Sequence, residues 1–125
     1  MLEHLWRRVD SALSETRTAT LVSDGPAGLQ ADELPCTAQG RRIYLLVPQT
    51  SDQLVNLADD TPVVVTSSAW RLHGTARVLP DEVWPVGLFA ETSAARWSVL
   101  VEVTPARLEL GPRAGWGYAE TIDLR

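Results

Sequence analysis

Several residue types are scarce or absent in this chain of 125 residues, and each scarcity limits what the protein can be. Lysine is absent, so all eleven basic residues are arginine. Any anion site must therefore use arginine, hydroxyl or backbone N–H groups. Cys36 is the only cysteine. A lone cysteine forms no internal disulfide, which favours a reducing, cytoplasmic setting.

Long apolar runs and an excess of positive charge are also missing. The net charge is -5, and an acidic domain is a poor partner for nucleic acid or anionic membranes, because phosphates must be met by basic side chains. No apolar run approaches the roughly 20 residues of a transmembrane helix. The composition, 45% hydrophobic and 22% charged, is that of a globular protein. We expect one domain over residues 1–125, with no nucleic-acid or membrane partner.

The two ends of the chain differ in character. Apolar residues recur at helical spacing over residues 2–13, which predicts an amphipathic N-terminal helix within residues 1–14. The last segment, residues 111–125, is rich in glycine and is predicted to be a tail that carries Trp116 and Tyr118.

The middle of the chain reads mainly as β-strands. Residues 43–47 are apolar on both faces, which predicts burial against the core on one side and against a helix or a second subunit on the other. Residues 80–96 are expected to form an irregular excursion with helical turns. Because strands outnumber helices and follow one another through short turns, the pattern favours an antiparallel barrel. The predicted strands cover residues 18–23, 29–36, 43–47, 63–68, 71–79 and 97–110, the last interrupted at Pro105.

Two local patterns lie on or beside these strands. Thr50 to Gln53 fits a Thr-x-x-Gln capping box, which predicts a short helix whose free N–H groups are met by these two side chains. Residues 71–79 alternate, with Leu72, Gly74, Ala76 and Val78 on one face and Arg71, His73, Thr75 and Arg77 on the other. The small residues of the first face, Gly74 and Ala76, fit a tight barrel turn or a close backbone approach. The second face is either a solvated surface or an anion site.

The five tryptophans are many for this length. We expect Trp6 in the core under the helix and Trp97 in the barrel core. Trp70, Trp84 and Trp116 are expected at a dimer interface or, alternatively, in a cleft for a flat ring.

Motifs for common chemistries are not found in the sequence. There is no nucleophile elbow, no phosphate-binding loop and no Gly-x-Gly-x-x-Gly. His4 and His73 have no ligand partners at metal-binding spacing. No metal and no catalytic residue is therefore predicted.

The order of elements over residues 16–110 resembles the pyridoxamine-phosphate-oxidase-like split β-barrels. The resemblance lies in four sequence segments. They are the strand and short helix of residues 43–57, the segment 56–65 that ends in Pro-Val-Val-Val, the strand 70–78 with its Gly-x-Ala, and the strand 101–108. The resemblance implies a mainly β split barrel of six or seven antiparallel strands. It also implies a homodimer that binds FMN in the cleft between subunits.

The family typically holds the flavin phosphate with a basic residue on the second strand, a hydroxyl at the end of the third strand, and the Ser and Lys of a Ser-x-Lys turn. In this chain Ser51 matches the serine, Gln53 stands at the lysine, and Val47 stands near the hydroxyl. Residues 29–36 contain no basic residue. Arginines of neighbouring strands, Arg41, Arg42, Arg71 or Arg77, are candidates to replace the missing charge. The cofactor-binding residues implied are Thr50, Ser51, Gln53, Arg42 and Arg71.

Two functions remain open at this point. The first is an FMN-binding flavoprotein with oxidoreductase activity. The second is a non-catalytic dimeric split barrel that has lost FMN and binds another small molecule or none. Ser51 and Gln53 are phosphate contacts in the first case and helix-capping residues in the second. A different small β-barrel, with a helix over residues 29–36, is a third alternative for the fold.

Overall fold

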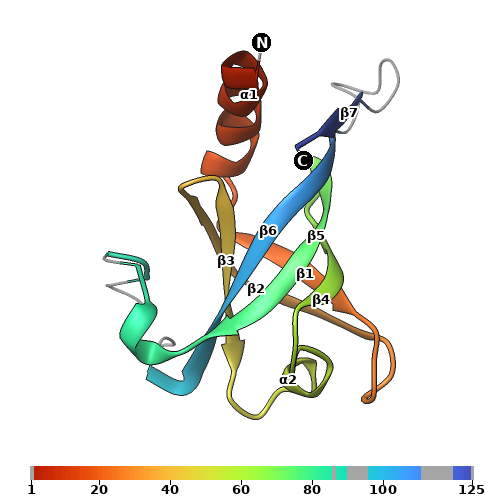
Figure 1. Ribbon diagram of the computed structural model, residues 1–125, viewed down its shortest axis with the longest axis vertical. Helices are drawn as coiled ribbons and strands as arrows, with labels where there is room; N and C mark the ends of the chain where they lie inside the picture. Colours follow the sequence, from red (N-terminus) through yellow and green to blue (C-terminus); the bar gives the residue numbers. More distant parts are fainter. Residues whose placement is uncertain (1, 86, 90–95, 111–119, 125) are drawn as a thin grey trace.

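The computed structural model describes residues 2–85, 87–89, 96–110 and 120–124. Its elements follow the order that the sequence predicts, and residues 29–36 contribute to a strand (Figure 1). The helices are α1 (Leu2–Ser14), α2 (Gln53–Asn56) and the 3-10 turn η1 (Asp81–Val83). The strands are β1 (Thr18–Ser23), β2 (Gln30–Gln39), β3 (Arg42–Pro48), β4 (Thr61–Thr66), β5 (Trp70–Leu79), β6 (Ser98–Leu110) and β7 (Glu120–Asp123).

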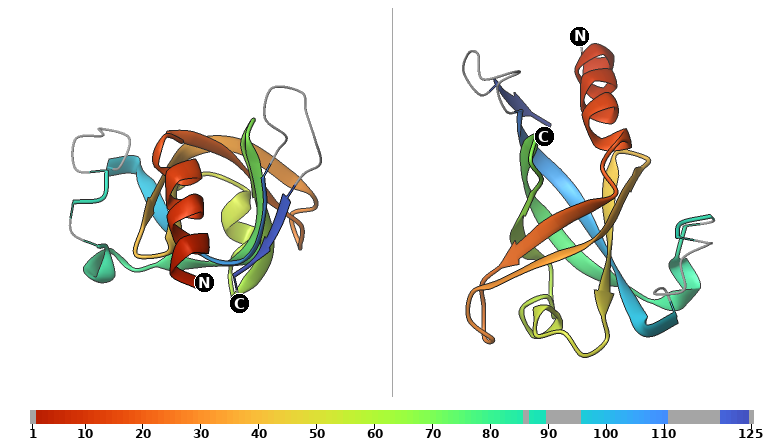
Figure 2. Two further views of the ribbon diagram at one scale, coloured as in Figure 1. Left: turned by 90° about the horizontal axis from the view of Figure 1, so that it is seen from above. Right: turned by 180° about the vertical axis from the view of Figure 1, so that it is seen from behind.

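The strands form an antiparallel barrel that confirms the predicted split-barrel fold. Their order is β3-β2-β1-β4-β5-β6-β7, and β3 also pairs with β6, which closes the first six strands into a ring. Helix α1 lies over one end of this ring and α2 lies at the other (Figures 1 and 2). Strand β7, from the predicted tail, pairs with the last residues of β6.

Strands β2 and β3 stay together for only part of their length. Gly40 and Arg41 both have positive φ, at 59° and 63°, and form the two-residue loop between the strands. The register runs from Gln39 opposite Arg42 to Cys36 opposite Leu45. Before Cys36, β2 pairs with β1. The two halves of β2 thus belong to different strand pairs, and α2 follows β3 on the side where β2 has diverged.

The apolar side chains fall into two clusters. The interior cluster combines inward residues of all seven strands with Trp6, Val9 and Leu13 of α1. Residues 43–47 are all buried, as predicted. Their outer side chains, Tyr44 and Leu46, form a second cluster with Leu79 and Leu100. Trp84, Leu88 and Phe89 of the same chain pack against this second cluster. The sequence had predicted that a helix or a second subunit would cover this face.

The interruption predicted at Pro105 is a bulge within one continuous strand. Strand β6 runs through it, and a bulge absorbs the irregularity: His73 pairs with Arg107 and Gly74 with Pro105, which leaves Ala106 as the extra residue. A Cβ on Gly74 would lie 2.5 Å from the Thr104 carbonyl oxygen. The predicted close approach at Gly74 is therefore confirmed, because only glycine leaves room for the bulged strand.

The tryptophans are placed differently from several expectations. Trp6 is buried, as predicted. Trp97 was expected in the core but is 71% exposed, because it precedes β6 at the rim of the barrel. Trp70 was expected at a cleft or an interface but is buried in the core, and its indole N–H donates to Thr16 Oγ1 at 3.0 Å. Trp116 and Tyr118 lie outside the described residues.

Among the described helices, none is both long and apolar enough to cross a membrane.

Candidate functional site

The turn between β3 and α2 carries the predicted phosphate residues. Thr50 is exposed and Ser51 is half-buried. The Gln53 backbone N–H donates to Ser51 Oγ at 3.1 Å. The N-terminal cap of α2 is Asp52, whose side chain makes no capping hydrogen bond. The predicted Thr50–Gln53 capping box is therefore wrong: Ser51 meets the backbone N–H, and the Gln53 side chain points elsewhere.

Gln53 is completely buried between α2 and the first two strands. Its side-chain Nε2 donates to the Leu21 carbonyl and to Asp32 Oδ2, both at 2.9 Å. Its Oε1 accepts a hydrogen bond from the Ser23 hydroxyl. Both amide hydrogens of Gln53 are thus bound within the protein, which satisfies a polar group that would otherwise be costly to bury.

Asn56 extends this network to the β1–β2 turn. Its Nδ2 donates to Ser23 Oγ at 3.1 Å and to the Gly28 carbonyl at 2.8 Å. Its Oδ1 accepts from the Ala27 N–H at 2.9 Å. Helix α2 is therefore attached to β1, to β2 and to the turn between them by buried hydrogen bonds. A sequence pattern cannot reveal such a network, because its members are about 30 residues apart.

The arginines named as substitutes lie away from this turn. Arg42 stands at the opposite end of β3, roughly 20 Å along the strand from Ser51, and its Nη1 donates to the Arg41 carbonyl. The Arg41 guanidinium lies over the Trp6 ring, 4.9 Å from its centroid. Arg71 and Arg77 lie on the outer face of β5. The structure therefore does not bring Arg42 or Arg71 together with Thr50, Ser51 and Gln53.

One arginine that the sequence did not nominate is nearer. The Gln49 N–H donates to the Trp97 carbonyl at 3.0 Å. This contact continues the β3–β6 pairing beyond Pro48 and Ser98, and it places the backbone of the exposed Arg96 one residue beyond the last paired position, near the turn. Only the tertiary pairing reveals this, since Gln49 and Trp97 are far apart in the sequence.

Carboxylates meet the basic residues on the outer face of β5 and β6. Arg71, His73 and Arg107 surround Glu109 at 3.6, 3.4 and 3.8 Å. The His73 contact lacks hydrogen-bond geometry and becomes an ion pair only when the imidazole is protonated. The face predicted from the alternation is confirmed, since Arg71, His73 and Arg77 all lie outside the core.

Glu102 accepts hydrogen bonds from two of its neighbours on this face. Arg77 Nε donates to Glu102 Oε1 at 3.1 Å, and the Tyr44 hydroxyl donates to Oε2 at 3.0 Å. Burial, followed by the bond to Glu102 and its charge, raises the pKa of Tyr44 above its usual value. Tyr44 is therefore a hydrogen-bond donor here rather than an anion or a base.

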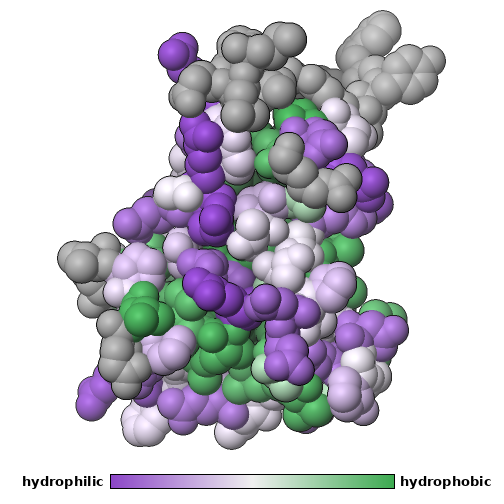
Figure 3. Space-filling view, in the orientation of Figure 1, coloured by the Kyte–Doolittle hydropathy of each residue, from purple (hydrophilic) through white to green (hydrophobic). Residues whose placement is uncertain are grey.

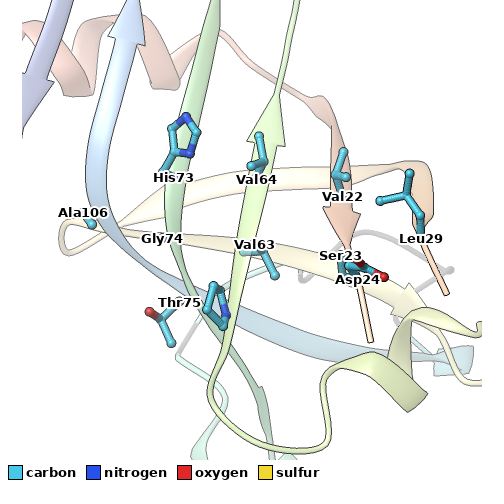
Figure 4. A pocket seen from close by; sticks show the side chains of 11 residues that line it. Val22, Ser23, Asp24, Leu29, Val63, Val64, His73, Gly74, Thr75 and Ala106 are labelled. Carbon is cyan, nitrogen blue, oxygen red and sulfur yellow. The ribbon is translucent and has the colours of Figure 1, made fainter. Parts of the chain in front are cut away.

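An apolar hollow of about 420 Å³ lies outside β1, β4 and β5. Val22, Val64 and His73 stand side by side across the three strands, in register, and form one wall (Figure 4). Leu29 and Pro62 add apolar surface, while Asp24 and Thr75 are polar. Ser23 also lines the hollow, so the hollow adjoins the network that holds Gln53.

A metal site and a reactive cysteine have little support in the part of the chain that the structure describes. No three His, Cys, Asp or Glu side chains among these residues lie together as metal ligands. Burial raises the pKa of the Cys36 thiol to about 12, so this cysteine is a poor nucleophile at neutral pH.

The sequence resemblance implies that this turn holds the phosphate of FMN. The side chain at the position of the family's lysine is Gln53, which is buried and has no free donor. Asp32 lies against it, where a phosphate would be repelled. These residues do not fit a phosphate held in the manner of the family.

Comparison with known proteins supports the fold. No family model and no curated protein sequence matches the chain. Among solved structures, general stress protein 26 from Bacillus anthracis str. Sterne is 14% identical, with a TM-score of 0.68 and 97% and 99% of the two chains covered.

Two further structures share the same architecture. A protein related to general stress protein 26, of the pyridoxinephosphate oxidase family from Clostridium acetobutylicum, is 13% identical, with a TM-score of 0.64 and 98% of this chain and 94% of that chain covered. The FAD binding protein from Mycobacterium smegmatis is 15% identical, with a TM-score of 0.56 and coverage of 82% and 90%. At such identities the likeness is one of fold.

Proposed function

We propose that this protein is a flavin-binding split-barrel protein that works as a homodimer, with the flavin ring in a cleft between two copies. The observation that carries the proposal is the shared fold, because structures with the same barrel include an FAD binding protein and members of the pyridoxinephosphate oxidase family. A bound flavin would supply oxidation–reduction chemistry. We assign no substrate.

The hollow beside His73 is the candidate site for the ring. Its volume of about 420 Å³ falls within the usual range of small-molecule sites, and such sites are mostly apolar with a few polar groups. The hollow has this character, with Val22 and Val64 beside His73 and Thr75. Its open side would be closed by a second copy.

An apolar surface near the hollow supports the dimer. Val78, Val83 and Trp97 are 37%, 56% and 71% exposed. All three belong to the end of β5 and to the segments beside it, which the views place on one side of the molecule. Figure 3 shows hydrophobic surface gathered in the lower part of the face seen there. Such exposed apolar side chains are typical of a surface that a partner covers.

A second candidate is a dimeric barrel that binds no flavin. It is favoured by a specific observation: Gln53 stands where the family has a lysine, and its amide is fully used inside the protein. This candidate predicts a colourless protein whose melting temperature does not respond to flavins.

The test is a titration of the purified protein with FMN and riboflavin, read by flavin fluorescence and by melting temperature. A ligand that binds only the native state must stabilise it. Val64→Phe fills the hollow and should weaken flavin binding at least about tenfold. Val55→Phe, on the exposed face of α2, is the matched control and should change nothing. Normal binding by Val64→Phe would remove the hollow as the ring site, and no binding by the wild type would leave the second candidate.

A further inference from the structure

We infer that the β3–α2 turn of this chain does not hold the phosphate of a flavin nucleotide. This inference rests on the proposed function, because its ligand is a flavin nucleotide. It concerns the phosphate at the β3–α2 turn, whereas the proposed function concerns the ring in the hollow beside His73. It follows from the donors and the charges that the turn presents.

Three backbone donors of the turn are already used. An anion beside a helix N-terminus is held by free N–H groups. Here the Ser51 N–H donates to the Pro48 carbonyl at 2.9 Å, and the Leu54 N–H donates to the Ser51 carbonyl at 3.2 Å. The Gln53 N–H donates to Ser51 Oγ at 3.1 Å. Helix α2 has only four residues, so its dipole adds little attraction for an anion.

The side-chain amide donors of Gln53 are used as well. A phosphate in this family's turn meets a lysine, whose ammonium group offers three N–H donors. Gln53 takes that place with no exposed surface, and both of its side-chain hydrogens are bound, one to the Leu21 carbonyl and one to Asp32. Turning this amide outward would remove the acceptor of the buried Ser23 hydroxyl and the donor to the half-buried Asp32, which is unfavourable.

The charges around the turn oppose a dianion. Asp32 lies against Gln53, and Asp52 is exposed at the start of α2. Among the described residues, Arg96 precedes Trp97, whose carbonyl accepts from Gln49 at the start of the turn. The carboxylates of Asp32 and Asp52 repel a phosphate, which would need net positive charge around it.

The experiment compares the affinities for FMN and riboflavin, which differ in the phosphate alone. It uses the wild type, Arg96→Ala and Ser51→Ala. We expect the FMN-to-riboflavin affinity ratio to stay within about threefold of the wild-type value in both variants. A wild-type preference for FMN of about tenfold or more that disappears in either variant would overturn the inference. A preference that survives both variants supports it, because the phosphate is then held elsewhere.

A second measurement keeps the inference testable if neither flavin binds, an outcome that would remove only the proposed function. Inorganic phosphate is titrated into the 15N-labelled protein, and the amide signals of Ser51, Asp52 and Gln53 are followed by NMR. No saturable shift of these signals is expected. A saturable shift that Arg96→Ala abolishes would show a phosphate site at the turn and overturn the inference.

Discussion

Gln53 shows how one buried amide can decide what a turn is able to bind. Its side chain joins α2 to Leu21 and Ser23 through buried hydrogen bonds and to Asp32 through a partly buried one. A residue used in this way contributes to stability rather than to ligand recognition. From the sequence alone, Gln53 shows only that the family's lysine is missing. The direction of its side chain is set by packing, which the sequence does not show.

At the residue scale, Gln53→Ala should lower the free energy of unfolding by about 2–4 kcal/mol, because it leaves the buried partners of the amide unsatisfied. Val55→Ala lies on the same helical turn at a position that is 51% exposed, and it should cost at most about 0.5 kcal/mol. Urea unfolding of both variants measures the difference. Equal, small losses would mean that the network does not hold α2 in place.

At the scale of elements, the pairing of β5 with β6 depends on one glycine and one bulge. Gly74 lies against the Thr104 carbonyl, and Ala106 is the bulged residue of β6, which has no paired residue on β5. The Ala106 carbonyl accepts a hydrogen bond from the Leu124 N–H at 2.8 Å. The bulge therefore turns a backbone acceptor toward the residue that follows β7. Pro105 is tolerated because it lies between the part of β6 that pairs with β3 and the part that pairs with β7.

Gly74→Ala tests this arrangement. The new methyl group would lie within 2.5 Å of the Thr104 oxygen, so the strands must move apart, at a cost of about 1–3 kcal/mol. Thr75→Ala, at the exposed neighbouring position, is the control and should change stability by about 0.5 kcal/mol or less. Thermal or urea denaturation measures both. If Gly74→Ala were as stable as Thr75→Ala, the close approach would not require glycine.

At the scale of the whole molecule, the outer surface of the barrel is divided. Carboxylates and arginines pair across β5 and β6, whereas the end of β5 and its neighbouring segments expose Val78, Val83 and Trp97. An exposed apolar patch of this kind is typical of an interface. Strand β5 is common to both features, since His73 and Thr75 line the hollow and Val78 belongs to the exposed apolar surface.

The dimer proposal predicts a mass of about twice 13.7 kDa in sedimentation experiments. Replacing Val83 and Trp97 together by serine removes two exposed apolar side chains and should shift the protein toward the monomer. Val55→Ser, which removes exposed apolar surface elsewhere, should leave the mass unchanged. A wild type that sediments as a monomer at all concentrations would contradict the dimer, and an unchanged double variant would place the interface elsewhere.

The barrel could be predicted from the sequence. Alternation along residues 71–79, the doubly apolar strand 43–47 and the small residues near the bulge depend on local chemistry, which a single chain shows. The site could not be predicted in this way. The burial of Gln53, the separation of Arg42 and Arg71 from Ser51, and the exposure of Trp97 all depend on contacts between residues far apart in the chain. Such contacts follow from strand pairing and packing, which no local pattern specifies.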